Sequence, residues 1–282
     1  MEYRIRITVL LLVVFLSLTR CKKVDYTGVI FYEESANERF EDSERWNSLN
    51  PFREIILPAD NYSILSVSDI HVGTTDNLDK FNSIALSLNP AAIVMTGDLT
   101  WGKKENYELL QQHLPDKDAL ITYLIAGNHD CNFKGWNEYF TRFGSSTYIF
   151  KIQTPVATDL FICLETAGAT IGKKQFDWLI NILEKERAGC RHCIIYTHTN
   201  IFRFKFSEAS NPQTEEIIAL LELVVRNRID MVITGHDHRK DEVKFGNTTY
   251  IVIPPLLDGH ASAGYFRLDV KDGKLDYRFV SL

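Results

Sequence analysis

The chain has 282 residues, of which 45% are hydrophobic and 24% are charged, with 15 glycines and 8 prolines. This composition is typical of a globular protein and excludes a chain that is disordered or fibrous throughout. The 31 basic and 37 acidic residues leave a formal net charge of −6. That charge argues against a protein that coats DNA or RNA, because such binding needs a basic surface, but it leaves small phosphate-bearing substrates open.

The first residues have the pattern of an export signal. Arg4 and Arg6 precede an apolar stretch that runs from Ile7 to Leu18. This stretch is shorter than the ~20 residues of a spanning helix and fits the ~7–15 residues of a signal peptide. We therefore predict a signal peptide over residues 1–20.

Cys21 follows this stretch and resembles the acylated cysteine of a bacterial lipoprotein, although Arg20 stands where a small residue is usual. We predict a lipid anchor at Cys21 that holds the exported protein on the bacterial cell envelope, at the periplasmic or outer-membrane face. A cleaved soluble form and an uncleaved signal anchor are the alternatives.

The rest of the chain divides into two parts. Residues 21–60 are polar and acidic without a sustained period, and we predict a tether followed by an irregular extension. Residues 61–282 alternate short apolar runs with amphipathic segments, which predicts one α/β domain with mixed sheets. The predicted strands are Ile64–Val67, Ala92–Met95, Thr122–Ile125, Leu160–Leu164, Cys193–Tyr196 and Met231–Ile233. Helical spacing of apolar residues marks Phe81–Leu88, Phe176–Leu183 and Ile217–Val224, and three strands with turn residues between them close the chain over residues 248–280.

Polar residues follow five of the predicted strands. Because ligands bind beyond the carboxyl ends of strands in α/β sheets, these residues are expected to meet on one side of the molecule. Glycine precedes the polar residue at Gly97, Gly127 and Gly235, which suits a sharp turn and a positive φ. The candidate ligands are Asp69, His71, Asp98, Asn128, His198, His236 and His238.

These seven side chains suit a pair of divalent cations. Two metals about 3.5–4 Å apart need one bridging ligand and several nitrogen and oxygen donors, and they clamp a phosphoryl oxygen and hold a hydroxide as nucleophile. Imidazole and carboxylate ligands without thiolates fit manganese, iron or zinc. Two cations, two carboxylates and one hydroxide leave a site charge of about +1, which attracts a phosphate ester.

His129 stands next to a candidate ligand without being one. A histidine in that place can protonate the leaving group as a general acid near neutral pH. Asp130 is predicted to orient that imidazole, and capping of the following helix is the alternative.

The order Asp69-x-His71, Gly97-Asp98, Gly127-Asn128-His129-Asp130, His198 and Gly235-His236-x-His238 resembles the calcineurin-like metallophosphoesterases. The resemblance covers roughly Tyr62 to Leu282. It implies a sandwich of two mixed sheets flanked by helices, and hydrolysis of phosphate mono- or diesters at a dinuclear centre. It also implies that Asp69, His71 and His238 hold one metal, that Asn128, His198 and His236 hold the other, that Asp98 bridges them, and that His129 is the proton donor. The family often continues its lone histidine with a second histidine and a proline, whereas His198 precedes Thr199-Asn200.

Other residues leave alternatives open. A catalytically inactive binding module at the cell surface is the competing function. The pair Cys190 and Cys193 has a spacing that permits a disulfide or a redox pair, although packing in the core is favoured. His113 and His192 are expected outside the site and His260 in a loop that can border it. Five residues near the motifs are candidates either for a substrate pocket or for packing: Trp101, Trp136, Tyr139, Phe202 and Arg239.

Overall fold

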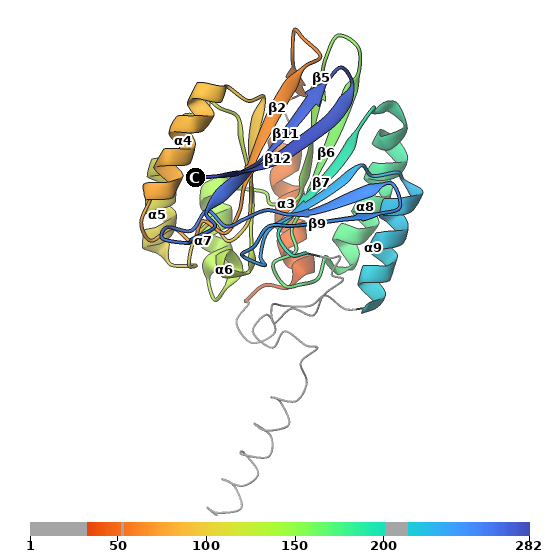
Figure 1. The fold of residues 1–282 in the computed structure, drawn as a ribbon. Helices are drawn as coiled ribbons and strands as arrows, with labels where there is room; N and C mark the ends of the chain where they lie inside the picture. The colour runs from red at the N-terminus through yellow and green to blue at the C-terminus, as the bar shows by residue number, and fades with distance from the viewer. Residues whose placement is uncertain (1–32, 52–53, 201–213) are drawn as a thin grey trace, which may run out of the picture.

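The structure is a computed structural model that describes residues 33–51, 54–200 and 214–282 (Figure 1). The predicted signal peptide, Cys21 and Phe202 lie outside the described residues. Within the described part, none of the helices has the length and apolar character needed to cross a membrane. The four cysteines in this part are all free thiols.

Two mixed β-sheets form the centre of the fold, as predicted. The seven-stranded sheet has the order β1 (Glu54–Ile56), β5 (Tyr148–Gln153), β6 (Thr158–Leu164), β7 (Cys193–Thr197), β8 (Met231–Thr234), β10 (Thr248–Val252) and β9 (Asp241–Phe245). The five-stranded sheet has the order β12 (Lys274–Ser281), β11 (Gly264–Lys271), β2 (Tyr62–Val67), β3 (Ala92–Thr96) and β4 (Thr122–Ile125). Strands β2, β3 and β4 are parallel to one another, and so are β6, β7, β8 and β10. Strand β5 pairs parallel with β1 and antiparallel with β6, whereas β9, β11 and β12 pair antiparallel with their neighbours. The strands predicted between residues 64 and 233 are all present.

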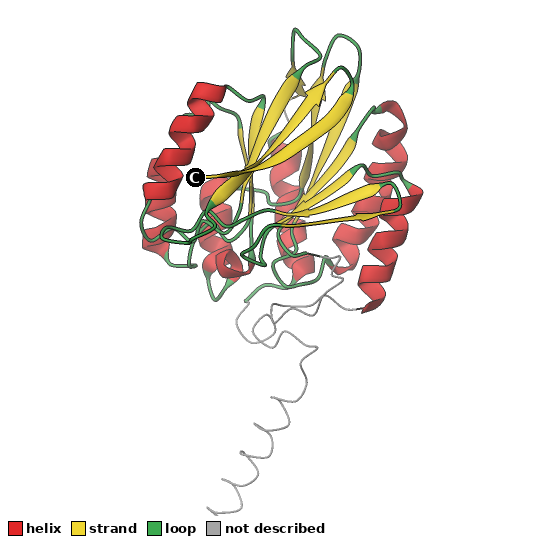
Figure 2. Cartoon of the chain, viewed as in Figure 1, coloured by secondary structure: helices red, strands yellow, loops and turns green. Residues whose placement is uncertain are grey.

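Helices cover the two outer faces, so the molecule has four layers (Figure 2). The five-stranded sheet is covered by α4 (Asp76–Leu88), α5 (Lys104–His113) and α7 (Gly135–Phe143). The seven-stranded sheet is covered by α8 (Gly172–Glu186), which continues into a 3-10 turn at Arg187–Gly189, and by α9 (Thr214–Arg226). The short α6 (Asn128–Cys131) follows β4, and α3 (Ala36–Leu49) packs beside α8.

The apolar core is divided by the two sheets. In β3, Ala92 and Val94 point between the sheets, while Ile93 and Met95 face the helices, because successive side chains of a strand alternate between its two faces. Both faces are buried, which explains the continuously apolar strand sequences. The parallel strands end at one edge of this core.

The expectation of an irregular extension over residues 21–60 is wrong for residues 54–56, which form β1 in the seven-stranded sheet, and for residues 36–49. The latter residues form α3, which begins with a capping box in which Ser35 and Glu38 exchange side-chain and backbone hydrogen bonds. The helix buries Ala36, Arg39, Phe40 and Ser43. Two of these four residues are polar, so the buried face has no continuous apolar stripe and does not stand out by hydrophobic periodicity.

Arg39 joins this helix to the core by a buried ion pair. Its Nε lies 2.9 Å from Glu165 Oε2, and both side chains are 1% exposed. Its Nη1 also donates to the backbone oxygen of Glu34 at 2.6 Å. Glu165 directly follows β6, so α3 is fixed to the sheet edge at which the parallel strands end.

We predict that Arg39→Met destabilises the protein by about 3–5 kcal/mol, because removing one partner leaves Glu165 as an uncompensated buried charge. The measurement is the free energy of unfolding from urea titrations followed by circular dichroism. Arg45→Met is the matched control on the same helix. Its ion pair with Asp42 is exposed, and the expected loss is below ~1 kcal/mol. Equal losses for the two variants would contradict an integral role for α3.

Candidate metal centre

The polar residues predicted to meet do so at one edge of the sandwich, where α6 lies in Figure 1. Each comes from a loop that directly follows a strand: Asp69 and His71 after β2, Asp98 after β3, Asn128 after β4, His198 after β7, and His236 and His238 after β8. All are buried or half-buried. The topology therefore brings together seven side chains that span 170 sequence positions.

Four of these residues form a first cluster, in which the possible ligand atoms all lie within 4.8 Å of one another: Asp69, His71, Asp98 and His238. The Nε2 atoms of His71 and His238 are 3.1 Å apart. His238 Nε2 lies 3.3 Å from Asp69 Oδ1. Two imidazole nitrogens and two carboxylates thus point at one small volume.

A second cluster contains His198, His236 and again Asp98. His198 Nε2 is 3.2 Å from His236 Nδ1 and 3.0 Å from Asn128 Oδ1. The other nitrogen of His198, Nδ1, is 2.8 Å from the backbone oxygen of Thr96. Because a carbonyl oxygen only accepts, Nδ1 carries the hydrogen of the neutral ring and Nε2 is left as the ligand atom.

Asp98 belongs to both clusters, and its two carboxylate oxygens make different contacts. Its Oδ2 lies 3.6 Å from His71 Nε2 and 3.3 Å from His198 Nε2, which places it between the clusters. Its Oδ1 accepts a hydrogen bond of 2.8 Å from the backbone N–H of His129. The same carboxylate is therefore placed to join two metal positions and to hold the loop of the candidate proton donor.

These donors fit divalent cations. Asp69 and Asp98 are 0% and 2% exposed, and buried carboxylates need a compensating positive charge. In the neutral ring, the free electron pair of His198 Nε2 points at the oxygens of Asn128 and Asp98, an arrangement that a cation between them stabilises. The ligand atoms are nitrogen and oxygen without sulfur, which suits manganese, iron or zinc.

Burial and neighbouring charges shift the pKa values of the candidate ligands. Burial lowers the pKa of His71 to about 4. Burial also lowers the pKa of His198, but the nearby Asp98 carboxylate outweighs it and raises that pKa to about 9. For Asp98, burial raises the pKa, and the neighbouring His198 more than reverses this and holds it well below its ordinary value. The carboxylates of the centre are therefore kept in the ionised form that binds metals.

The backbone of this centre is unusual, because five of the seven candidate ligands have left-handed φ values. They are Asp69 (51°), His71 (47°), Asp98 (49°), His236 (70°) and His238 (48°). For non-glycine residues such angles are uncommon, although Asp and His adopt them more readily than most, and they cluster at active sites. The surrounding hydrogen bonds hold them, as when the carboxylate of Asp69 accepts from the backbone N–H of His236 at 2.9 Å.

The three glycines singled out from the sequence leave room for the candidate ligands in two ways. Gly97 has the expected positive φ of 87°, and a Cβ there would lie 2.6 Å from the ring of His198. The expectation of a positive φ is wrong for Gly127 and Gly235. In these two places the need is for space, since a Cβ on Gly127 would collide with Asp98 and one on Gly235 with Ser68 and Asp69.

His129 and Asp130 have separate roles in the structure. The His129 imidazole is half-buried, its centroid is 4.7 Å from that of His71, and it has no hydrogen bond with any described residue. The Asp130 carboxylate instead accepts from the backbone N–H groups of Gly127, Leu99 and Thr100, each at 2.9 Å. The bond from Gly127 caps α6, the helix that contains Asp130, and the other two hold the loop after β3, so Asp130 does not cap the following helix α7. No contact in the described part of the chain joins Asp130 to the His129 ring. Burial, and then the charge of Asp98, raise the pKa of Asp130 to about 7.

Comparison with known proteins supports this reading of the geometry. A sequence model of the calcineurin-like phosphoesterases matches residues 62–240, which is more than half of the chain. The protein belongs to this family. No curated protein sequence matches it.

Solved structures share the fold of this calcineurin-like phosphoesterase at low identity. A dimetal phosphatase from Danio rerio has a TM-score of 0.62 and 12% identity, over 78% of this chain and 96% of the other. A purple acid phosphatase from yellow lupin has a TM-score of 0.62 and 13% identity, over 79% of this chain and 52% of that enzyme. GAP50, the anchor in the inner membrane complex of Plasmodium, has a TM-score of 0.61 and 14% identity, over 78% and 84%. Together they show the two-sheet sandwich.

The other residues singled out from the sequence lie partly next to the centre and partly away from it. His260 borders it, with its ring centroid 6.3 Å from that of His238. His113 pairs with Asp79 at the end of α5, and His192 directly precedes β7. Trp136 and Tyr139 are buried in the core, Arg239 pairs with Asp237 and Asp241, and Trp101 stacks on His71. Residues that the sequence analysis did not single out include Thr166, whose hydroxyl accepts from the backbone N–H of Thr199 beside His198.

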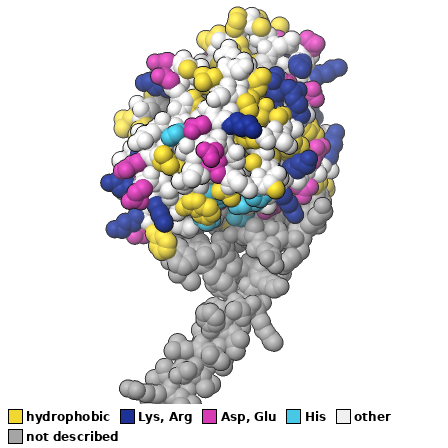
Figure 3. All heavy atoms as spheres, turned by 60° about the vertical axis from the view of Figure 1, so that its left-hand side comes forward, with side chains coloured by type: hydrophobic (Ala, Val, Ile, Leu, Met, Phe, Trp, Pro, Cys, Tyr) yellow, Lys and Arg dark blue, Asp and Glu magenta, His cyan; other side chains and the backbone are white. Residues whose placement is uncertain are grey.

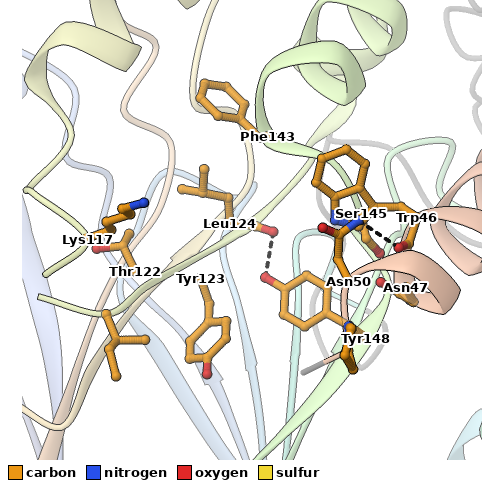
Figure 4. A pocket seen from close by; sticks show the side chains of 12 residues that line it. Trp46, Asn47, Asn50, Lys117, Thr122, Tyr123, Leu124, Phe143, Ser145 and Tyr148 are labelled. Carbon is orange, nitrogen blue, oxygen red and sulfur yellow. Dashed lines mark hydrogen bonds between the residues drawn. The ribbon is translucent and has the colours of Figure 1, made fainter. Parts of the chain in front are cut away.

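A separate cavity of about 330 Å³ lies beside edge strand β4 (Figure 4). It is lined by aromatic side chains, among them Trp46, Tyr123 and Tyr148, together with the amides of α3 and Lys117. None of the seven ligands lines it. Its floor is held by the hydrogen bond from the Tyr148 hydroxyl to the backbone oxygen of Leu124. The metal centre is thus not part of this cavity.

We predict that Gly235→Ala lowers the metal content of the purified protein, because the new Cβ must displace Ser68 and the carboxylate of Asp69. The measurement is metal per chain by mass spectrometry after dialysis against manganese or zinc. Gly189→Ala is the control, since a Cβ at that position meets nothing within 4 Å. Metal contents that agree between the two variants would show that the space at Gly235 is not needed for the ligands.

Proposed function

We propose that the protein hydrolyses phosphate mono- or diesters at a dinuclear metal centre. The observation that carries this proposal is the pair of ligand clusters that share Asp98, with the His129 ring beside the first of them. Membership of the calcineurin-like phosphoesterases supports hydrolase activity and divalent metals. The identity of the metals, among manganese, iron and zinc, is left to experiment.

In this proposal, the residues of the chain have the following roles. Asp69, His71 and His238 hold one cation, Asn128, His198 and His236 hold the other, and Asp98 joins the two positions. When bound, such a pair polarises the phosphoryl group and activates a water for attack. His129 donates a proton from its imidazole to the leaving oxygen, for which a partly exposed ring without a hydrogen-bond partner among the described residues is suited. Asp98 holds His129 in place through the hydrogen bond with its backbone N–H.

The surface charge of the protein is compatible with such a substrate. The chain is acidic overall, but the centre concentrates cations where the phosphate binds, and local charge decides the binding of a small anion. A long polyanion such as a nucleic acid duplex would instead meet the acidic surface. We therefore propose a small or dispersed phosphate ester as the substrate.

A catalytically inactive binding module is the second hypothesis. Its support is that the similar GAP50 structure is described as an anchor. Against it, all seven ligand positions and the proton-donor position of this chain carry functional side chains in converging positions. A screen of phosphate mono- and diesters with manganese or zinc separates the two hypotheses, because an inactive module shows no metal-dependent turnover.

We predict that His129→Ala retains the bound metals but lowers kcat by about 10²–10⁴-fold, the usual contribution of a general acid. The assay uses alkyl phosphates, whose poor leaving groups need protonation most. His113→Ala is the control, because that histidine pairs with Asp79 away from the centre. An unchanged kcat for His129→Ala would remove the proton-donor role, and a metal-free wild-type protein without turnover would remove the proposed function.

We further propose export to the bacterial cell envelope with a lipid anchor at Cys21, which rests on the sequence pattern of residues 1–21. Cys21→Ser is expected to shift the protein from the membrane fraction to the soluble fraction. The measurement is fractionation followed by immunoblotting, with Cys190→Ser as the matched control. An unchanged membrane fraction for Cys21→Ser would favour an uncleaved signal anchor instead.

A further inference from the structure

Trp101 lies directly over the metal centre, in the loop that follows β3. Its indole stacks on the imidazole of His71, with centroids 4.1 Å apart and ring planes at 28°. It also meets the imidazole of His129 edge-on, at 5.2 Å and 89°. One indole therefore contacts both a metal ligand and the candidate proton donor.

The exposure of this indole distinguishes it from the other aromatic residues near the ligand loops. Trp101 is 44% exposed, whereas Trp136 is 2% exposed and Tyr139 is fully buried. Figure 3 shows histidine side chains next to hydrophobic ones near the lower edge of the described surface in that view. An indole has two flat faces, and stacking on His71 covers only one of them. Because 44% of Trp101 is exposed, a flat ligand that covers the indole would remove apolar area from water, which is favourable.

The position of Trp101 relative to His129 indicates which part of a substrate it contacts. In the proposed function, metals held by the ligand clusters would bind the phosphoryl group, and His129 would protonate the oxygen that leaves. The leaving group therefore extends from the metals past the His129 ring. Because Trp101 is in edge contact with that ring, the leaving group passes beside the indole.

We propose that Trp101 determines specificity by stacking on the leaving group, so that the protein prefers phosphate esters whose leaving group carries a planar aromatic ring. This proposal rests on the proposed function. The ring can belong to an aryl alcohol or to a nucleobase, since both offer a π-face that stacks on indole. An alkyl or sugar leaving group has no such face and gains nothing from Trp101.

The test compares substrates that differ only in the ring. Adenosine 5′-monophosphate and ribose 5-phosphate share the same primary alkoxide, as do benzyl phosphate and cyclohexylmethyl phosphate, so that leaving-group chemistry cancels within each pair. Trp101→Ala is expected to lower kcat/KM for the ring-bearing member by roughly 5- to 100-fold, the range of one aromatic stacking contact. The member without an aromatic ring should change by less than about two-fold, and the loss for the aromatic member should appear mainly as a higher KM, as for a binding contact.

Two further variants separate stacking from a structural role. Trp101→Phe keeps a ring over His71 and should lose only part of the preference. Trp46→Ala is the matched control, because Trp46 is similarly exposed, at 37%, but lines the cavity of Figure 4. Metal content is measured for each variant. If Trp101→Ala loses metal, Trp101→Phe is compared with the wild type on the same substrate pairs instead.

Equal losses for both members of each pair, with metal retained, would overturn the proposal, because they indicate that Trp101 only shields His71. A loss for both ring-bearing substrates supports a general aromatic preference. A loss for adenosine 5′-monophosphate alone supports a nucleobase, and one for benzyl phosphate alone an aryl group.

A binding measurement tests the stacking without turnover. In a metal-loaded His129→Ala protein, adenosine 5′-monophosphate should quench indole fluorescence and ribose 5-phosphate should not. The double variant His129→Ala, Trp101→Phe should lose that quenching. If the wild type hydrolyses no phosphate ester, the proposed function fails, while this measurement still decides whether Trp101 binds the ring; equal fluorescence with both ligands would overturn it.

Discussion

The carboxylate of Asp98 is the interaction on which the rest of the centre depends. One oxygen lies between His71 and His198, which belong to different sheets, and the other holds the backbone of His129. Asp98 is 2% exposed, so these interactions act in a medium where charge is poorly screened. A displacement of this one side chain would change its contacts with both ligand clusters and with the backbone of His129 together.

Such a carboxylate has to be held by a rigid backbone, and the four layers provide it. The ligands sit on the last residues of buried parallel strands or directly after them, where the main chain is fixed by the sheets. Asp98 and four other ligands have left-handed φ values, and Gly97, Gly127 and Gly235 leave space where side chains approach the main chain. Strain of this kind persists only where the surroundings over-determine the backbone.

Local patterns predicted much of the fold. Periodicity predicted the apolar strands β2, β3, β4, β6, β7 and β8 and the amphipathic helices α4, α8 and α9. In each of them the local pattern of apolar residues shows which side chains are buried. Helix α3 was missed because its buried face includes Arg39 and Ser43, whose burial depends on Glu165 and the rest of the core. The pair Ser35 and Glu38 has the spacing of a capping box and was the one local signal for it. For Asp130, residue type and position suggested two roles, but its carboxylate instead joins the start of its own helix α6, at Gly127, to Leu99 and Thr100 in the loop after β3.

The sequence by itself determined which residues are candidates for the chemistry, because ligand type and position after a strand are local properties of the chain. It could not determine that Asp98 lies within reach of both clusters, that five ligands adopt left-handed backbone, or that Trp101 and not Trp136 faces the centre. These features depend on distances between residues that are far apart in the chain. Only the packing of the two sheets and their helices sets those distances, since it decides which side chains are covered and which meet.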